Sequence, residues 1–408
     1  MNTIFHRTEL ADSLAERLLN PGALDVALRS GLFLRGMRRT GKSTFLRHDF
    51  IPALEARGAV VVYVDLWQDP SRSPATLVHQ AIRDTVDELA RPESRLLKKL
   101  RAVTDLDASA FGVGFGLSLE KIGEPEGPTL AQALTRLVDR AEGDVVLIID
   151  EVQHALGTEP GRDLLFALKA ARDAVNLRPD TPGLLLFVGT GSHRALVGEL
   201  TEQRSQAFAG ARTMDFPLLG QDYVGDLLSR LKGLRLSDGR VMPLPSPDVA
   251  LEAFATVGHR PEDLLQAFDL LRNRLDTNSE TLDDPDIHLP TIAATLRASA
   301  VDVELAKLDR MGALASALFA RLVVDEQDDG RGARGFFGED SLQSLSESLG
   351  RAVSSDDVTA ALRAMTSENL VMRLGHGRYG IADPVVRELS RERHERLESL
   401  RQSTSLDG

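Results

Sequence analysis

The chain has 408 residues and a formal net charge of −13 at pH 7, with 42% hydrophobic and 27% charged residues. These values are typical of a globular protein of two or three domains and exclude a fibrous or wholly disordered chain. No apolar run approaches the roughly 18 residues of a membrane span, and residues 1–20 do not resemble a signal peptide. Because cysteine is absent, disulfides and thiolate zinc sites are excluded, and we expect a cytoplasmic protein.

Short apolar runs alternate with helical patterns in the N-terminal half of the chain. The runs cover residues 32–35, 59–65, 145–149, 184–188 and 213–216. Runs of this length that are separated by helices are typical of a parallel sheet buried on both faces. We therefore predict an α/β domain over residues 1–218.

Helical periodicity replaces the strand pattern after residue 218. Patterns at 223–231, 247–255 and 261–275 predict a helical lid over residues 219–304, with loops at 237–246 and 277–290.

The next segment, residues 305–390, carries a different order of elements. Helices are predicted at 314–324, 340–349 and 356–368, followed by strands 370–374 and 378–381 around a glycine turn. Three helices followed by a hairpin is the order of a winged helix. Residues 391–408 are left as a C-terminal tail.

Two segments interrupt these patterns. Within residues 108–128, the stretch 111–119 alternates glycine or serine with apolar side chains, which fits either a hairpin insertion or a flexible loop. Residues 325–338 are rich in glycine and charge, and we predict a mobile insert there.

A glycine-rich loop follows the first predicted strand. It reads Gly36-Met37-Arg38-Arg39-Thr40-Gly41-Lys42-Ser43, which matches the Walker A pattern, and a helix is expected from Thr44. Its backbone N–H groups and Lys42 would hold the phosphates, and Ser43 would ligate Mg²⁺. Arg38 and Arg39 add positive charge, or are solvated loop arginines. The residues expected to bind ATP are Gly36, Arg38, Arg39, Thr40, Gly41, Lys42, Ser43 and Thr44.

The predicted strand 145–149 ends in two adjacent carboxylates, Asp150 and Glu151. Asp150 would hold the Mg²⁺ shell and Glu151 would polarise the attacking water, because one acid cannot do both from a single position. Alternatively, Asp150 only ends a core strand and caps the next helix. The strand at 59–65 lies between the two motifs, which favours the ASCE branch of P-loop NTPases, whose members hydrolyse ATP with a dedicated glutamate.

Five further residues are candidates for the same chemistry. Thr190 or Ser192, after the strand 184–188, would contact the γ-phosphate or the lytic water, or Ser192 only caps a helix. Arg204 and Arg212 precede the last strand and are candidate arginine fingers, acting in cis or in trans, or surface arginines. Arg260 would reach the nucleotide from the lid, unless the turn before Pro261 is a plain helix start.

The ordered motifs resemble AAA+-related ATPases, and among them the archaeal-type or STAND-like ATPase family. The resemblance is carried by Phe5, Arg7, residues 9–10, 38–43, 147–151, 191–192, 210–213, 216–218, 258–261 and 374–384. It implies a nucleotide-binding domain, a helical lid and a winged helix, with ATP used to switch conformation or assembly. Members of this family often have a second glycine at the position of His259, so the histidine departs from the family pattern.

Two functions are possible for such a protein. The first is a switch that acts on a protein partner or on copies of itself, and the second is a DNA-handling ATPase in replication, transposition or defence. The charge of the C-terminal segment distinguishes between them. Residues 311–390 carry eight Lys or Arg against twelve Asp or Glu, a net charge of −4. The helix that would enter a DNA groove begins with Asp356 and Asp357, which would repel phosphates. We therefore expect a protein partner or self-association and disfavour DNA.

Overall fold

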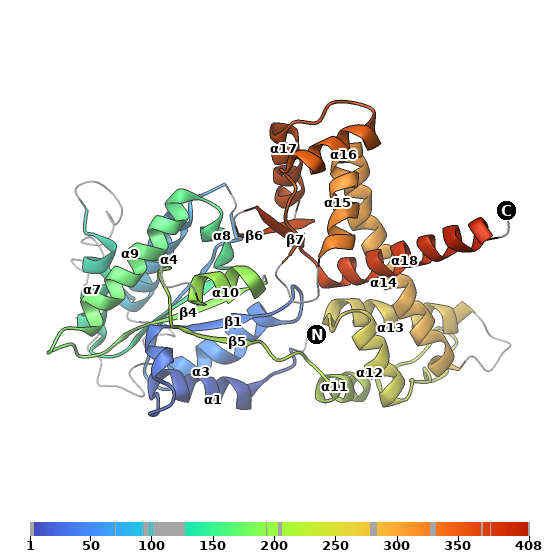
Figure 1. The fold of residues 1–408 in the computed structure, drawn as a ribbon. Coiled ribbons are helices and arrows are strands. Elements are labelled where there is room, and N and C mark those ends of the chain that lie inside the picture. The colour runs from blue at the N-terminus through green and yellow to red at the C-terminus, as the bar shows by residue number, and fades with distance from the viewer. Residues whose placement is uncertain are drawn as a thin grey trace. The chain divides into compact units, whose positions relative to one another are not determined.

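The computed structural model describes residues 4–69, 71–91, 93, 98, 100, 127–192, 194–202, 206–277, 284–326, 332–368, 370–375 and 377–406. The chain divides into two compact units (Figure 1). The first comprises Met1–Gly36 and Lys42–Phe216, and the second comprises Met37–Gly41 and Pro217–Gly408. Of the segment predicted at 108–128 as a hairpin insertion or a flexible loop, residues 108–126 lie outside the described residues.

The first unit is built on a five-stranded sheet in the order β2-β3-β4-β1-β5. The strands are β1 Leu32–Arg35, β2 Val60–Asp65, β3 Val145–Asp150, β4 Leu185–Gly191 and β5 Arg212–Asp215. All neighbouring strands are parallel, and the carboxyl ends of β2 and β3 are in register, with Asp65 beside Asp150. The predicted parallel α/β sheet is confirmed, and β4 lies between β1 and β3.

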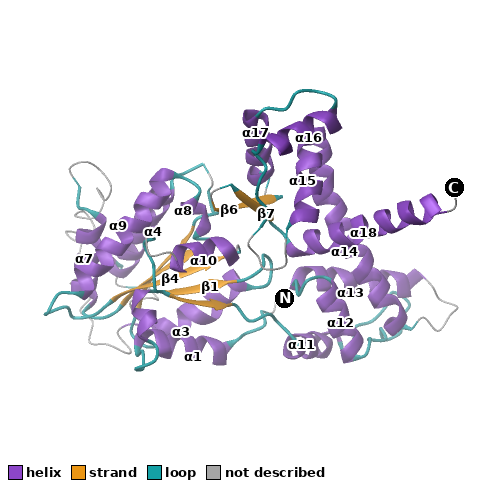
Figure 2. Ribbon diagram, in the orientation of Figure 1, coloured by secondary structure: helices purple, strands orange, loops and turns teal. Residues whose placement is uncertain are grey.

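Helices cover both faces of this sheet (Figure 2). On one face lie α1 Thr8–Leu19, η1 Val26–Ser30, α2 Lys42–Phe45, η2 Leu46–Phe50 and α3 Ile51–Glu55. On the other lie α4 Pro74–Ala90, α7 Leu130–Ala141, α8 Gln153–Leu156, α9 Glu159–Asn176 and α10 Arg194–Glu202. Successive β3 side chains alternate between the two cores: Leu147 packs in one, whereas Val146 and Ile148 pack in the other. Burial on both faces explains the continuous apolar runs of the sequence.

The second unit begins with four helices. They are α11 Gln221–Leu231, α12 Pro247–Thr256, α13 Pro261–Thr277 and α14 Pro285–Met311. The prediction of a loop at 277–290 is wrong for residues 285–290, which form the start of α14. Pro285 occupies the first turn, where its missing N–H costs nothing, and Asp284 caps the helix through Asp286 N–H. The boundary predicted between 304 and 305 falls inside this 27-residue helix.

The remaining elements follow the predicted order. They are α15 Ala313–Asp325, α16 Glu339–Leu349, α17 Ser355–Ser367, β6 Val371–Gly375, β7 Arg378–Ile381 and α18 Pro384–Leu406. Strands β6 and β7 form an antiparallel hairpin, so three helices precede a hairpin, as in a winged helix. The predicted tail is helical through Leu406.

The predicted mobile insert is wrong for the described residues 332–338. Ala333 exchanges two backbone hydrogen bonds with Tyr379 of β7, at 2.7 and 2.9 Å. Phe336 is fully buried and packs against the ring of Tyr379. The charge and glycine content of this segment predicted a mobile insert, although residues of it pair with β7 and pack in the core.

Across the described part of the chain, every helix is too short or too polar to cross a bilayer.

Candidate nucleotide-binding and hydrolysis site

The phosphate-binding loop begins where β1 ends. Gly36 N–H donates to the carbonyl of Gly191 at 3.1 Å, which fixes the loop against the end of β4. A Cβ on Gly36 would lie 3.2 Å from Cβ of Phe216, and Gly41 has a φ of 89°, which a glycine adopts without strain. The two motif glycines therefore serve close packing at one end of the loop and a left-handed turn at the other.

Lys42 lies at the first position of α2 and is 5% exposed. Its ammonium donates to the carbonyl of Gly36 at 2.6 Å, so the side chain folds back across the loop. Ser43, one residue further along, is exposed. A glycine-rich loop that leads into the start of a helix is typical of sites that bind nucleotide phosphates.

The helix behind the loop is tied to the N-terminal segment. Asp49 of η2 is buried and accepts hydrogen bonds from Arg7 N–H at 3.1 Å and His6 Nδ1 at 2.6 Å. The guanidinium of Arg7 lies 4.9 Å from the ring centroid of Phe216. Arg7 could be noted from the sequence only as part of the family resemblance. Asp49 could not be identified from the sequence, because nothing in its neighbourhood marks it as buried.

Asp150 is completely buried at the end of β3. The hydroxyl of Tyr63 donates to Asp150 Oδ2 at 2.9 Å, and the hydroxyl of Thr190 donates to Oδ1. Burial, and then the nearby charge of Asp150, raise the pKa of Tyr63, so its phenol stays protonated and remains a donor. Tyr63 was not predicted as a site residue; its place two residues before the end of β2, in register with β3, was the available signal.

Glu151 lies beside a second set of donors. Ser192 donates to Glu151 Oε2 from its hydroxyl at 2.9 Å and from its backbone N–H at 3.3 Å, and Gln153 Nε2 donates to the same oxygen. Glu151 N–H donates to Thr190 Oγ1 at 3.3 Å. The structure thus brings together four residues that the sequence singled out separately: Asp150, Glu151, Thr190 and Ser192.

The backbone at Glu151 is unusual for an acidic residue. Its φ of 57° lies in the left-handed region, which non-glycine residues seldom adopt. This conformation turns the chain sharply between β3 and α8, and such conformations are concentrated at functional sites.

Of the two arginine-finger candidates, the structure describes Arg212, which lies apart from this cluster. Arg212 is exposed and pairs with Leu32 at the start of β1, whereas the phosphate loop follows Arg35 at its end. Three strand residues separate the two ends by about 10 Å. Arg212 therefore lies at the amino-terminal ends of the parallel strands, whereas its own phosphate loop begins at their carboxyl ends. Arg204 lies outside the described residues.

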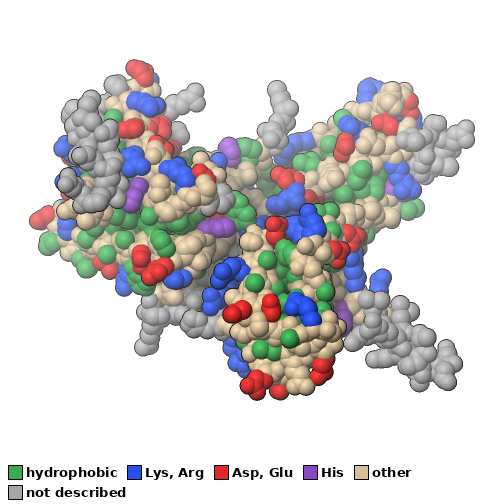
Figure 3. Space-filling view, turned by 90° about the horizontal axis from the view of Figure 1, so that it is seen from above, with side chains coloured by type: hydrophobic (Ala, Val, Ile, Leu, Met, Phe, Trp, Pro, Cys, Tyr) green, Lys and Arg blue, Asp and Glu red, His purple; other side chains and the backbone are tan. Residues whose placement is uncertain are grey.

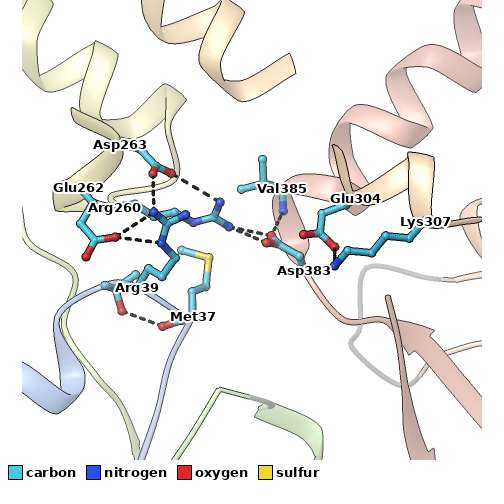
Figure 4. Close-up of polar contacts among 10 residues, drawn as sticks. Met37, Arg39, Arg260, Glu262, Asp263, Glu304, Lys307, Asp383 and Val385 are labelled. Atoms are coloured by element: carbon cyan, nitrogen blue, oxygen red, sulfur yellow. Dashed lines mark hydrogen bonds and ion pairs between the residues drawn. The ribbon is translucent and has the colours of Figure 1, made fainter. Parts of the chain in front are cut away.

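The second unit holds the lid arginine in an ion-pair network (Figure 4). Arg260 is 7% exposed and donates from Nη2 to both carboxylate oxygens of Asp383, at 2.9 and 2.7 Å. Asp263 lies 3.8 Å from Arg260 and 3.0 Å from Arg39 of the phosphate loop. Arg39 also donates to Glu262 at 2.8 Å. Arg39 is therefore an exposed loop arginine that is ion-paired with the first turn of α13.

His259 occupies the position where the resembling family often has a glycine. Its φ is 54°, the left-handed conformation that glycine adopts readily. The imidazole Nδ1 lies 3.1 Å from the carbonyl oxygen of Leu219, and the ring packs edge-on against Phe254. The histidine thus keeps the glycine-type turn and uses its side chain to hold α12 and the segment before α11.

The sequence of the first unit matches a known protein family. Residues 28–197 match the family model described as an AAA domain. The match covers both motifs and the strands β1 to β4 that carry them. The first unit is therefore a P-loop domain related to the AAA+ ATPases. No curated protein sequence matches the chain.

Several solved structures share a similar arrangement of elements. The Aeropyrum pernix ORC1 protein in complex with DNA has a TM-score of 0.44 at 18% identity, covering 97% of this chain and 95% of that one. The Aeropyrum pernix ORC2 protein, in ADPNP-ADP complexes, has a TM-score of 0.42 at 13% identity, covering 96% and 95%. CDC6P from Pyrobaculum aerophilum has a TM-score of 0.40 at 15% identity, covering 96% of each chain.

Proposed function

We propose that this protein binds MgATP at the loop from Gly36 to Ser43 and hydrolyses it with Glu151. The observation that carries the proposal is the cluster at the ends of β3 and β4, where a buried aspartate and an adjacent glutamate have separate sets of hydroxyl and amide donors. Two carboxylates in different surroundings can take different roles, one toward the metal and one toward water.

The donor chemistry fits Mg²⁺, which prefers oxygen ligands and retains several waters. Ser43 and Asp150 would hold the ion, whose charge would offset that of the phosphates. The two hydroxyl groups on Asp150 fix its carboxylate and leave further lone pairs on each oxygen. Lys42 would leave the Gly36 carbonyl and pair with the phosphates, and Glu151 would accept the proton of the attacking water.

The test separates binding from hydrolysis with two variants. Lys42→Ala should lose most affinity for a fluorescent ATP analogue, because it removes the phosphate partner. Glu151→Gln should bind MgATP like the parent but release phosphate at least about a hundredfold more slowly, the scale of a lost general base. Glu142→Gln is the matched control, because Glu142 is an exposed glutamate that also has a left-handed φ, of 47°. Parental turnover by Glu151→Gln would refute the assignment.

We infer further that ATP switches the conformation or assembly of the protein toward a protein partner. The lid arginine supports this proposal, because Arg260 is paired with Asp383 just before α18. If nucleotide phosphate competes for Arg260, binding of ATP releases Asp383 and the start of α18. Hydrogen exchange of the Glu151→Gln protein with and without ATP should then show faster exchange near residues 383–388. Unchanged exchange there would contradict the switch.

The alternative, a DNA-handling ATPase, has weaker support from surface charge. Among exposed residues of α17, Asp356 and Arg363 contribute one charge of each sign. On the face seen in Figure 3, basic and acidic side chains are interspersed. Nonspecific DNA affinity depends on basic side chains that displace counterions. We expect no micromolar binding of labelled duplex DNA by the full chain at about 150 mM salt. Salt-sensitive micromolar binding would favour the DNA-handling alternative.

A further inference from the structure

Gln153 is a buried polar residue that the roles proposed above do not explain. It lies at the first position of α8, two residues after Glu151, and is 5% exposed. Its Nε2 donates to Glu151 Oε2 and, at 3.0 Å, to Ser192 Oγ. Ser192 Oγ in turn donates to Glu151 Oε2. The amide therefore closes a triangle with the carboxylate and the hydroxyl.

The direction of the amide follows from its neighbours. A carboxylate oxygen only accepts hydrogen bonds, so the NH₂ end of Gln153 must face Glu151. The other end, Oε1, is buried and makes no hydrogen bond among the described residues. Burying a polar atom in this way costs free energy, so packing alone does not favour a glutamine at this position.

The end of β4 is shaped around this amide. A Cβ on Gly191 would lie 2.7 Å from Gln153 Oε1 and would also clash with Val197. Only a glycine at this position lets the glutamine reach Glu151 without a shift of the neighbouring atoms. The absence of a side chain at Gly191 therefore provides the space that the Gln153 amide occupies.

We propose that Gln153 is the positioning residue that fixes the orientation of the Glu151 carboxylate for hydrolysis. The proposal rests on the ATPase function proposed above and deepens it. Glu151 has a left-handed backbone directly after β3, and donors from Gln153 and Ser192 restrict the rotation of its carboxylate. A general base acts efficiently only when its orientation is held.

The first experiment replaces Gln153 with methionine, which keeps the length of the side chain and removes the donor. Turnover should fall at least about tenfold, as expected for a misplaced catalytic group, while the dissociation constant of a fluorescent ATP analogue stays unchanged. Gln343→Met is the matched control, because Gln343 makes the same type of contact with Glu347 on α16, at 2.9 Å. That variant should keep the parental rate.

The second experiment distinguishes positioning from general structural support. In the Glu151→Gln background, single-turnover hydrolysis of radiolabelled ATP should show no further loss on adding Gln153→Met, since the glutamine acts through the carboxylate. An equal fold-loss in both backgrounds would overturn the proposal, as would parental turnover of Gln153→Met. If Gln153→Met fails to fold by circular dichroism, Gln153→Leu also removes the amide donor and provides the same comparison. Absence of ATP binding by the parent would refute the proposed function itself.

Discussion

The ion pair between Arg260 and Asp383 provides a prediction about stability. Asp383→Asn removes the charge but keeps an oxygen that can accept from Val385 N–H, as Asp383 Oδ1 does at 2.9 Å. The Arg260 side chain is only 8% exposed, against 30% for Asp383. Removing one partner of a fully buried pair costs about 3–5 kcal/mol. Because water reaches Asp383 and Asp263 stays 3.8 Å from the guanidinium, we expect a loss of about 2 kcal/mol.

The single tryptophan allows the two units to be followed separately. Trp67 lies in the first unit, so its fluorescence reports that unit, whereas far-ultraviolet circular dichroism reports helices of both. During urea unfolding, Asp383→Asn should lower the midpoint of the circular-dichroism transition and leave the Trp67 transition in place. Asp269→Asn is the control. The side chains of Arg272 and Asp269 are 42% and 56% exposed, and an exposed ion pair contributes about 0–1 kcal/mol to the free energy of unfolding. Equal effects of the two variants, or a shift confined to Trp67, would refute the reasoning.

Two further predictions concern other parts of the chain. Arg212 is far from its own phosphate loop, so any finger role must be in trans: mixing Arg212→Ala with Lys42→Ala protein should restore some turnover, and activity that does not depend on concentration would exclude that role. Burial raises the pKa of Glu326 above its ordinary value of 4.5, so the stability contributed by its protonated form is present below pH 4.5 and lost as the pH rises through the folded pKa. Glu326→Gln keeps an oxygen that accepts from Ile381 N–H. Its free energy of unfolding should therefore increase relative to that of the parent as the pH rises above 4.5. A difference in free energy of unfolding that does not change with pH would contradict this.

Much of the fold could be predicted from local pattern. Strands β1 to β4 are fully buried or nearly so, and burial on both faces produces apolar runs that are visible in the sequence. The phosphate loop and the pair Asp150 and Glu151 were predictable because their residue types follow from phosphate and water chemistry at fixed spacing. Thr190 lies near the end of β4 and Ser192 directly follows it, and the structure places β4 between the two strands that carry the motifs.

The remaining features depend on contacts that local pattern does not reveal. Gln153 and Tyr63 act through neighbours on other elements, and neither has a sequence neighbourhood that distinguishes it from a core or surface residue. Long helix α14 was missed at its start because Pro285 and Pro290 resemble loop residues, although the first turn of a helix tolerates proline. The pairing of Arg260 with Asp383 joins residues 123 positions apart and required the fold.

The five residues Met37–Gly41 group with the second unit, while Gly36 before them and Lys42 after them belong to the first. The polypeptide therefore passes from one unit to the other three times, and no single cleavage produces two intact halves. A fragment that ends at Phe216 would retain Arg39 but lose Glu262 and Asp263. Phosphate-loop behaviour measured on such a truncated protein would consequently describe a loop deprived of its ion-pair partners.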